Sequence, residues 1–261
     1  MNKRAQHAVT FRDTQARLAT EPTLTQAIQH SHTFVDWPLP NRHPAALTST
    51  TIIEHWRNTT TLQAVFRCWQ RQPDHIMGVL NFASARHPGG GVERGASAQE
   101  ESLCRASGLW PCLVAQPRMY TLNNHNAKQG LYHHCGIVSP RVPLLKNDDG
   151  ELLPTPIFMN VLSMPAVNAM EARRHQIPEA TINVVMAERL AHVLALAYHT
   201  GQKELVLGAF GCGVFGNNIE RVAAQWQTLL STTFQHCFHR IIFATINDHE
   251  YTALARVVRG E

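Results

Sequence analysis

Residues 76–101 read IMGVLNFASARHPGGGVERGASAQEE, and this stretch decides the fold class. Its first part, Ile76–Ala83, is an apolar run of the length expected for a buried strand. Three successive glycines, Gly89–Gly91, follow in a loop, and a helix is predicted from about Ala98 to Ser107. A strand, a glycine loop and a helix in this order are typical of an α/β protein whose site lies at the end of a strand.

The rest of the chain continues this alternation of strands and helices. Further strands are expected at Ile137–Val142 (an edge strand), Ile157–Ser163, Glu204–Phe210 and Arg240–Ile246. Helices are expected at 12–30, Thr61–Arg71, Thr181–His199 and Ile219–Leu230, with a loop from Ser31 to Pro44 and a turn at Asn147–Gly150. The pattern predicts an α/β fold with a mixed sheet sandwiched between helices.

Length and charge set limits on organisation and partners. At 261 residues the chain fits one domain, and we expect a single domain over 1–261 with an N-terminal helical extension, 1–58, packed on it. The formal net charge of +4 is compatible with a phosphorylated ligand. Because no run of Lys and Arg is present, a nucleic-acid-binding arm is not indicated.

The cysteines and histidines indicate the compartment and argue against a metal centre. Six cysteines form no C-x-x-C pair, which favours reduced thiols and a cytoplasmic protein. The sixteen histidines are scattered, so no metal site is expected. The N-terminal segment carries charges throughout, and no membrane association is expected. We expect a monomer.

The first glycine loop has the features of a ligand site. Three glycines in a row allow positive φ and let a ligand approach the backbone, and the helix that follows favours an anion at its start. Glu100 and Glu101 lie in the first turn of this helix and have two interpretations. In the structural interpretation, Ser97 and Glu100 form a capping box and Glu101 pairs with Arg105. In the functional interpretation, the two carboxylates take part in catalysis.

A second glycine loop, Gly208–Asn217, reads GAFGCGVFGN and places G-x-G-x-x-G between a strand and a helix. This is the dinucleotide-binding pattern of Rossmann proteins. Two features count against that interpretation: the loop lies late in the chain, and Asp248 comes 32 residues after Gly216 rather than about 20. A diphosphate-binding loop remains the better hypothesis. Cys212 within it is predicted to be a packed thiol rather than a nucleophile.

Taken together, these motifs resemble the bacterial-type poly(ADP-ribose) glycohydrolases, a branch of the macrodomain fold. The shared signature is Gly89–Gly91, a spacer of seven residues, and then Gln99-Glu100-Glu101. The resemblance runs from about Thr59 to Ile246, whereas the first fifty residues match poorly. Ordinary macrodomains carry Asn-Ala-Ala-Asn where this chain has Asn-Phe-Ala-Ser at 81–84, which suits the glycohydrolase branch.

The sequence also departs from the glycohydrolase pattern within the second loop. The family often has Trp at the position of Phe210, Arg at the position of Gly216, and Asp-Pro after Asn217. These differences bear on substrate range more than on chemistry.

The resemblance implies a macrodomain-like cleft that binds a terminal ADP-ribose and releases ADP-ribose as product. It implies that Glu101 acts on the ribose–ribose bond and that Glu100 orients the substrate. It implies no metal and no cofactor. The substrate-binding residues that it implies are Asn81, Ser84, Gly89, Gly90, Gly91, Val92, Gln99, Gly211, Cys212, Gly213, Val214 and Phe215.

Helix geometry predicts different roles for the two glutamates. Adjacent helical residues point about 100° apart, so Glu100 and Glu101 should not flank one bond from opposite sides. A mechanism with one catalytic carboxylate follows. The alternatives are an enzyme that removes single ADP-ribose units from protein or nucleic acid, a non-catalytic ADP-ribose reader, and a Rossmann oxidoreductase.

Overall fold

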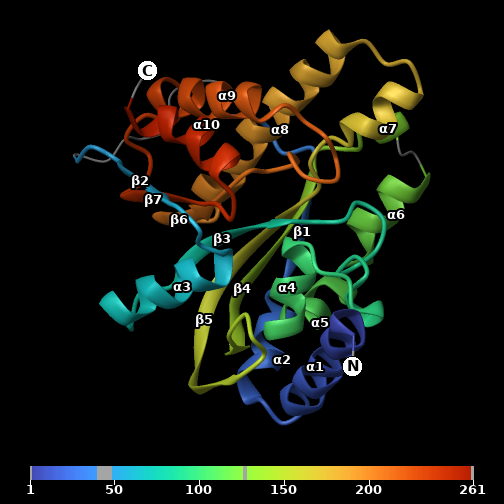
Figure 1. Cartoon of the computed structure of the whole chain (residues 1–261), viewed down its shortest axis with the longest axis vertical. Helices are drawn as coiled ribbons and strands as arrows, with labels where there is room; N and C mark the ends of the chain where they lie inside the picture. The colour runs from blue at the N-terminus through green and yellow to red at the C-terminus, as the bar shows by residue number, and fades with distance from the viewer. Residues whose placement is uncertain (1, 40–48, 126–127, 260–261) are drawn as a thin grey trace.

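The computed structural model describes residues 2–39, 49–125 and 128–259, and these form a seven-stranded mixed sheet (Figure 1). The strand order is β1-β4-β5-β3-β6-β7-β2. Strands β5, β3, β6, β7 and β2 run parallel, and β4 is antiparallel to both of its neighbours. The strands are β1 (His32–Val35), β2 (Ile52–Trp56), β3 (Met77–Phe82), β4 (Cys135–Lys146), β5 (Leu152–Met164), β6 (Glu204–Leu207) and β7 (Arg240–Ala244).

Helices cover both faces of this sheet, as the sequence predicted. The α-helices are α1 (Lys3–Leu18), α2 (Pro22–Gln29), α3 (Thr61–Arg71), α4 (Gln99–Ala106), α5 (Leu109–Val114), α6 (Pro117–His125), α7 (Ala169–Arg174), α8 (Glu179–His199), α9 (Ile219–Ser231) and α10 (Asp248–Arg259). Two short 3₁₀ segments are η1 (Val92–Arg94) and η2 (Lys128–Gly130). Helices α7–α10 pack on one face, and α1–α6 pack on the other.

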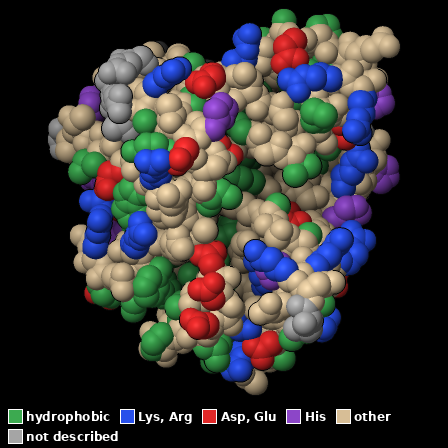
Figure 2. Space-filling view, in the orientation of Figure 1, with side chains coloured by type: hydrophobic (Ala, Val, Ile, Leu, Met, Phe, Trp, Pro, Cys, Tyr) green, Lys and Arg blue, Asp and Glu red, His purple; other side chains and the backbone are tan. Residues whose placement is uncertain are grey.

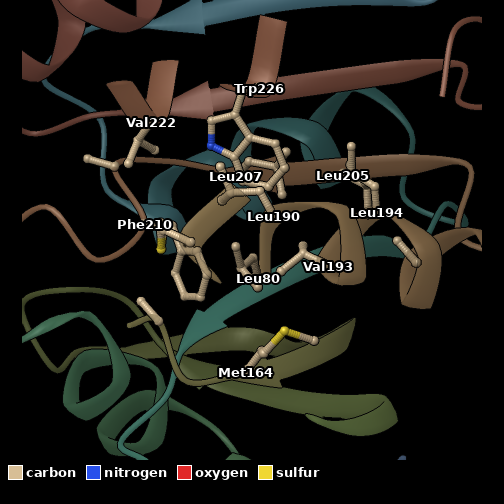
Figure 3. Close-up of a cluster of buried hydrophobic side chains, with 14 of the residues drawn as sticks. Leu80, Met164, Leu190, Val193, Leu194, Leu205, Leu207, Phe210, Val222 and Trp226 are labelled. Atoms are coloured by element: carbon tan, nitrogen blue, oxygen red, sulfur yellow. The ribbon is translucent and has the colours of Figure 1, made fainter. Parts of the chain in front are cut away.

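The alternation of side chains along the strands builds a core on each face. In β3, Leu80 joins the core under α8 and α9, whereas its neighbour Val79 joins the core under α3–α5. Figure 3 shows the first of these cores, where Leu80 of β3 lies near Val193 of α8 and Leu205 of β6 lies near Leu194 of α8. Such burial of aliphatic side chains is the main stabilising contribution to a fold of this kind.

Two of the helices, α3 and α8, lie close to their predicted positions. The α3 helix begins with a real capping box, because the Thr60 hydroxyl accepts from the Gln63 amide and the Gln63 side chain accepts from the Thr60 amide, both at 3.1 Å. The α8 helix is the single helix in the described ranges that is long and apolar enough to cross a membrane, but 61% of its apolar window is buried in the core. It is a core helix of this fold.

The N-terminal region differs from the sequence-based expectation. The single helix expected over 12–30 was wrong: the chain forms α1 and α2, because Pro22 occupies the first turn of a new helix. The loop expected over Ser31–Pro44 contains β1, while residues 40–44 lie outside the described residues. The region 1–58 also supplies β1 and β2, the two edge strands of the sheet.

Strand β4 was also placed wrongly as an edge strand. It is longer than expected and pairs with β5 on one side and with β1 on the other. The other elements with no counterpart in the sequence analysis are β2, the helices α5, α6, α7 and α10, and the 3₁₀ segments η1 and η2. All except α10, which has 12 residues, are short, and short elements carry little periodicity of their own.

The parallel strands bring the important loops to one edge of the sheet. The carboxyl ends of β5, β3, β6, β7 and β2 face the same way. The two glycine loops follow β3 and β6, which are neighbours in the sheet. Ligands of α/β proteins bind outside the carboxyl ends of the strands, so a binding site is expected at this edge of the sheet.

Candidate active site

The start of α4 is fixed to the end of β3 by the side chain of Gln99. Its Oε1 atom accepts from the Phe82 amide at 2.9 Å, and its Nε2 atom donates to the Leu80 carbonyl at 2.8 Å. The capping box expected from Ser97 and Glu100 was wrong: the N-cap residue is Ala98, and no side chain caps the helix. The first amides of α4 therefore keep their capacity to bind an anion.

Glu100 points inward to the protein instead of capping the helix. Its carboxyl group accepts from the Ser84 amide at 2.8 Å and from the Asn81 side chain at 3.3 Å. Only 3% of the residue is exposed. Burial is the main cause that raises the pKa of Glu100 to about 8, so the group is largely a neutral acid at pH 7. Asn81 is fully buried behind it and also bonds to Ser163.

Glu101 turns the other way, toward the glycine loop. Its Oε1 atom accepts from the Gly91 amide at 2.9 Å, and no partner for Oε2 lies within the described residues. The side-chain pair with Arg105 does not form, because Arg105 donates to the backbone carbonyls of Ala96 and Glu101. The carboxyl group of Glu101 is thus held at one oxygen and available at the other.

The glycine loop brings both carboxyl groups together. Gly89 and Gly90 have φ angles of +69° and +59°, which L side chains rarely adopt. A Cβ atom on Gly90 would lie 2.4 Å from Oε1 of Glu101 and 3.2 Å from Oε2 of Glu100. Both acids therefore approach this glycine from the same side. Val92 contributes its side chain to the core, so only its backbone is available to a ligand.

The second glycine loop is held in a tight arch between β6 and α9. Gly211 has φ of +77° and lies against Asn217, whose side chain donates to the Val167 and Gly211 carbonyls at 2.7 and 2.9 Å. Within the described chain, the backbone amides of 213–215 have no hydrogen-bond partner. Free amides of this kind suit a diphosphate. Burial raises the pKa of the Cys212 thiol to about 12, which agrees with its expected role as a packed thiol.

A cavity of about 340 Å³ lies between the start of α4 and the second glycine loop. Figure 2 shows the molecule hollowed near the centre of this face, with hydrophobic side chains in the hollow. Val214 and Ile246 at its mouth are 86% and 67% exposed. The cavity is lined by Gln99 but not by Glu100 or Glu101, which lie just beyond it. Among the described residues, no group of three or more His, Cys, Asp or Glu could hold a metal ion.

Several lining residues carried no signal in the sequence. Asp148 reaches the cavity from the tip of the β4–β5 hairpin, where it accepts from the Thr60 hydroxyl at 2.6 Å. Only the turn itself could be predicted from Asn147–Gly150, because the place of its tip depends on the path of two long strands. The other lining residues that the sequence analysis missed include Phe82, Phe210, Ile246 and Glu250.

The family model described as the catalytic domain of microbial-type PARG matches residues 3–147. The chain belongs to the microbial-type PARG family. The expectation that the first fifty residues fall outside the resemblance was wrong, because the match begins at residue 3. No curated protein matches the chain.

Solved structures of poly(ADP-ribose) glycohydrolase (PARG) are similar over almost the whole chain. The enzyme from Thermomonospora curvata is 34% identical, with a TM-score of 0.89, and the match covers 97% of this chain and 100% of that one. The same enzyme bound to the inhibitor ADP-HPD is 34% identical, with a TM-score of 0.84, over 97% and 99% of the two chains. PARG from Deinococcus radiodurans in complex with ADP-ribose is 32% identical, with a TM-score of 0.78, over 92% and 98%. The predicted fold class and family are confirmed.

The burial of Glu100 in this PARG-family chain predicts a pH-dependent stability. The pKa of Glu100 is about 8 in the folded chain, against an ordinary value of 4.5. Between these values unfolding releases a proton, so the free energy of unfolding should fall as pH rises from about 5 to about 8. Glu100→Gln should flatten this dependence. Denaturant unfolding of both proteins across that range checks the prediction, and parallel profiles would contradict it.

Proposed function

We propose that this enzyme hydrolyses the ribose–ribose O-glycosidic bond of poly(ADP-ribose) and releases ADP-ribose. The observation that carries the proposal is the pair of buried carboxyl groups beside Gly90, within a chain of the PARG family. The second glycine loop and the start of α4 offer free amides for the diphosphate. The distal ribose would then extend from the cavity past Gln99 toward Gly90.

In the proposed mechanism Glu101 is the general acid and then the general base. Its carboxyl group gives a proton to the leaving oxygen as the bond from the anomeric carbon to that oxygen breaks. The resulting carboxylate then takes a proton from a water molecule, whose oxygen bonds to the anomeric carbon. Oxygen Oε2 suits both transfers, because Oε1 is occupied by the Gly91 amide. Glu100 holds the ribose in place from its buried position.

The remaining predicted site residues divide into two groups under this proposal. Asn81, Ser84 and Gln99 act through the protein, because each is hydrogen-bonded to Glu100 or to the end of β3. The backbone of Gly89–Val92 and that of Gly211–Phe215 contact the substrate directly in this proposal.

Phe215 is predicted to serve turnover more than folding. It lines the cavity, is only partly buried, and has its ring centroid 6.3 Å from that of Tyr132. We expect Phe215→Ala to reduce kcat/KM about tenfold or more, with a loss of stability below the ~3–5 kcal/mol typical of truncating a core Phe. Turnover and thermal unfolding of the same preparation check this. A collapsed unfolding midpoint would show that Phe215 is mainly a core anchor.

Binding of ADP-ribose provides the first test of the function. The purified chain, with chelator present and no added metal, should bind ADP-ribose, because the second glycine loop and the start of α4 offer free amides to the diphosphate. Isothermal calorimetry and a thermal-shift titration would measure it. Absence of both heat and shift at millimolar ADP-ribose would overturn the proposal.

Substrate preference provides the second test. Labelled poly(ADP-ribose), mono-ADP-ribosylated protein and mono-ADP-ribosylated DNA should be compared side by side in single-turnover reactions. We expect release of ADP-ribose from the polymer to be fastest. Faster release from a mono-modified carrier would favour a mono-ADP-ribosyl hydrolase, and binding without any release would favour a reader.

We also propose the cytoplasm as the location of the enzyme. Five of the six cysteines are buried, as expected for packed thiols in a reducing compartment. Cell fractionation with an antibody to the chain would test this.

A further inference from the structure

The short helix α7 contacts the second glycine loop and the segment that leads into the first. The Arg86 guanidinium, which precedes the first loop, lies 2.7 Å from Oε1 of Glu171 in α7. On the other side, the Met170 amide donates to the Phe215 carbonyl at 3.1 Å, and Arg173 donates to the Gly216 carbonyl at 2.9 Å. The α7 helix therefore joins the segment before the first glycine loop, which both acids approach, to the loop assigned to the diphosphate.

Glu171 is the centre of this connection. Its Oε2 atom accepts from the Tyr132 hydroxyl and from the Asn168 side chain, each at 3.4 Å, while its Oε1 atom receives Arg86. Its side chain is only 25% exposed, which distinguishes it from the freely exposed ion pairs of this chain. Partners on three segments fix the carboxylate in one place.

Tyr132, the third member of the connection, is held in an unusual conformation. Its φ angle is +58°, which costs a non-glycine residue of the order of 1–3 kcal/mol and persists only where the surroundings impose it. The fully buried Arg189 imposes it here by donating to the Leu131 and Tyr132 carbonyls at 2.9 and 3.3 Å. This backbone conformation lets the Tyr132 hydroxyl donate to Glu171 and places the Tyr132 ring beside Phe215.

We propose that Glu171 is a positioning residue that, through Arg86 and Tyr132, fixes the distance between the two glycine loops during the reaction. The inference rests on the proposed function, in which one substrate spans both loops. A reacting bond displaced by about 1 Å can lose about 10²-fold in rate, so the loop that holds the diphosphate must be fixed relative to Glu101. Nothing else in the mechanism requires Glu171, which touches neither acid.

The experiment measures kcat and KM on poly(ADP-ribose), together with ADP-ribose affinity, for Glu171→Gln, Arg86→Gln and the double variant. Arg17→Gln is the matched control, because Arg17 lies in an ion pair of similar length and exposure within α1, 2.9 Å from Asp13 and 47% exposed against 41% for Arg86. A charge-reversed variant, Arg86→Glu with Glu171→Arg, tests for rescue.

We expect each single variant to lower kcat about tenfold with a smaller change in ADP-ribose affinity. The double variant should lose no more than either single one, because both remove the same connection. Arg17→Gln should keep wild-type kinetics, and the charge-reversed pair should recover part of the lost kcat. Wild-type kcat in Glu171→Gln, or losses that multiply in the double variant, would overturn the inference. A wild-type enzyme without hydrolytic activity would instead contradict the proposed function.

Discussion

Replacing Glu101 by Gln is expected to abolish hydrolysis of poly(ADP-ribose) while ADP-ribose affinity changes by no more than a few-fold. The amide keeps the size of the side chain and can still accept from the Gly91 amide, which lies 2.9 Å from Oε1. It cannot exchange a proton with the leaving oxygen or with water. Loss of general acid–base catalysis should reduce kcat by about 10² to 10⁴ or more. Single-turnover rates and calorimetry on the same variant separate the two effects.

Glu100→Gln is the matched variant, because it changes the neighbouring residue of the same helix in the same way. With its pKa raised to about 8 by burial, Glu100 is already mostly neutral at pH 7, so a neutral amide is a conservative replacement there. We expect a clearly smaller loss of kcat than for Glu101→Gln. Equal losses would show that the division into a catalytic and a positioning acid is wrong. Wild-type turnover in Glu101→Gln would show that Glu101 is not the catalytic acid.

Much of the fold could be predicted because its signals are local. The apolar run of β3, the glycines after it and the helical pattern of α3 each depend on a few neighbouring residues. The α8 helix begins two residues before its predicted start and ends at the predicted His199. Signals of this kind also located both glycine loops.

The site depends on contacts between distant segments, which local sequence patterns do not predict. The capping box of Ser97 and Glu100 satisfied the sequence pattern, but the Ser84 amide and Asn81 draw the Glu100 carboxyl group inward. Both partners lie on another segment, and they reach Glu100 only when α4 packs against β3. The contact of Asp148 with Thr60 is of the same kind, since it joins residues 88 positions apart. Contacts between distant segments therefore decide that Glu100 turns inward and Glu101 turns toward the glycine loop.

Gly90→Ala is expected to lose at least ~10²-fold in kcat, because the added methyl group would occupy the place of the carboxyl group of Glu101, the proposed catalytic acid. Its Cβ would lie 2.4 Å from Oε1 of Glu101, so this carboxyl group must move or the loop must open. Displacements of about 1 Å at a reacting group cost about this much in rate. The substitution also carries a backbone cost of about 1–2 kcal/mol, because φ is +59° at this position.

Gly201→Ala separates these two effects. Gly201, just beyond the end of α8, has φ of +74°, but a Cβ there would meet nothing within 4 Å. It should therefore show the backbone cost in its unfolding free energy and keep wild-type turnover. Gly90→Ala should lose a similar amount of stability, but unlike Gly201→Ala it should also lose activity. If both variants keep wild-type kcat at a temperature where both are folded, the close approach of Glu101 to the glycine loop does not matter for the reaction. If Gly90→Ala regains activity when Glu101 is shortened to Asp, which withdraws the carboxyl group from the methyl, displacement of that acid is the cause.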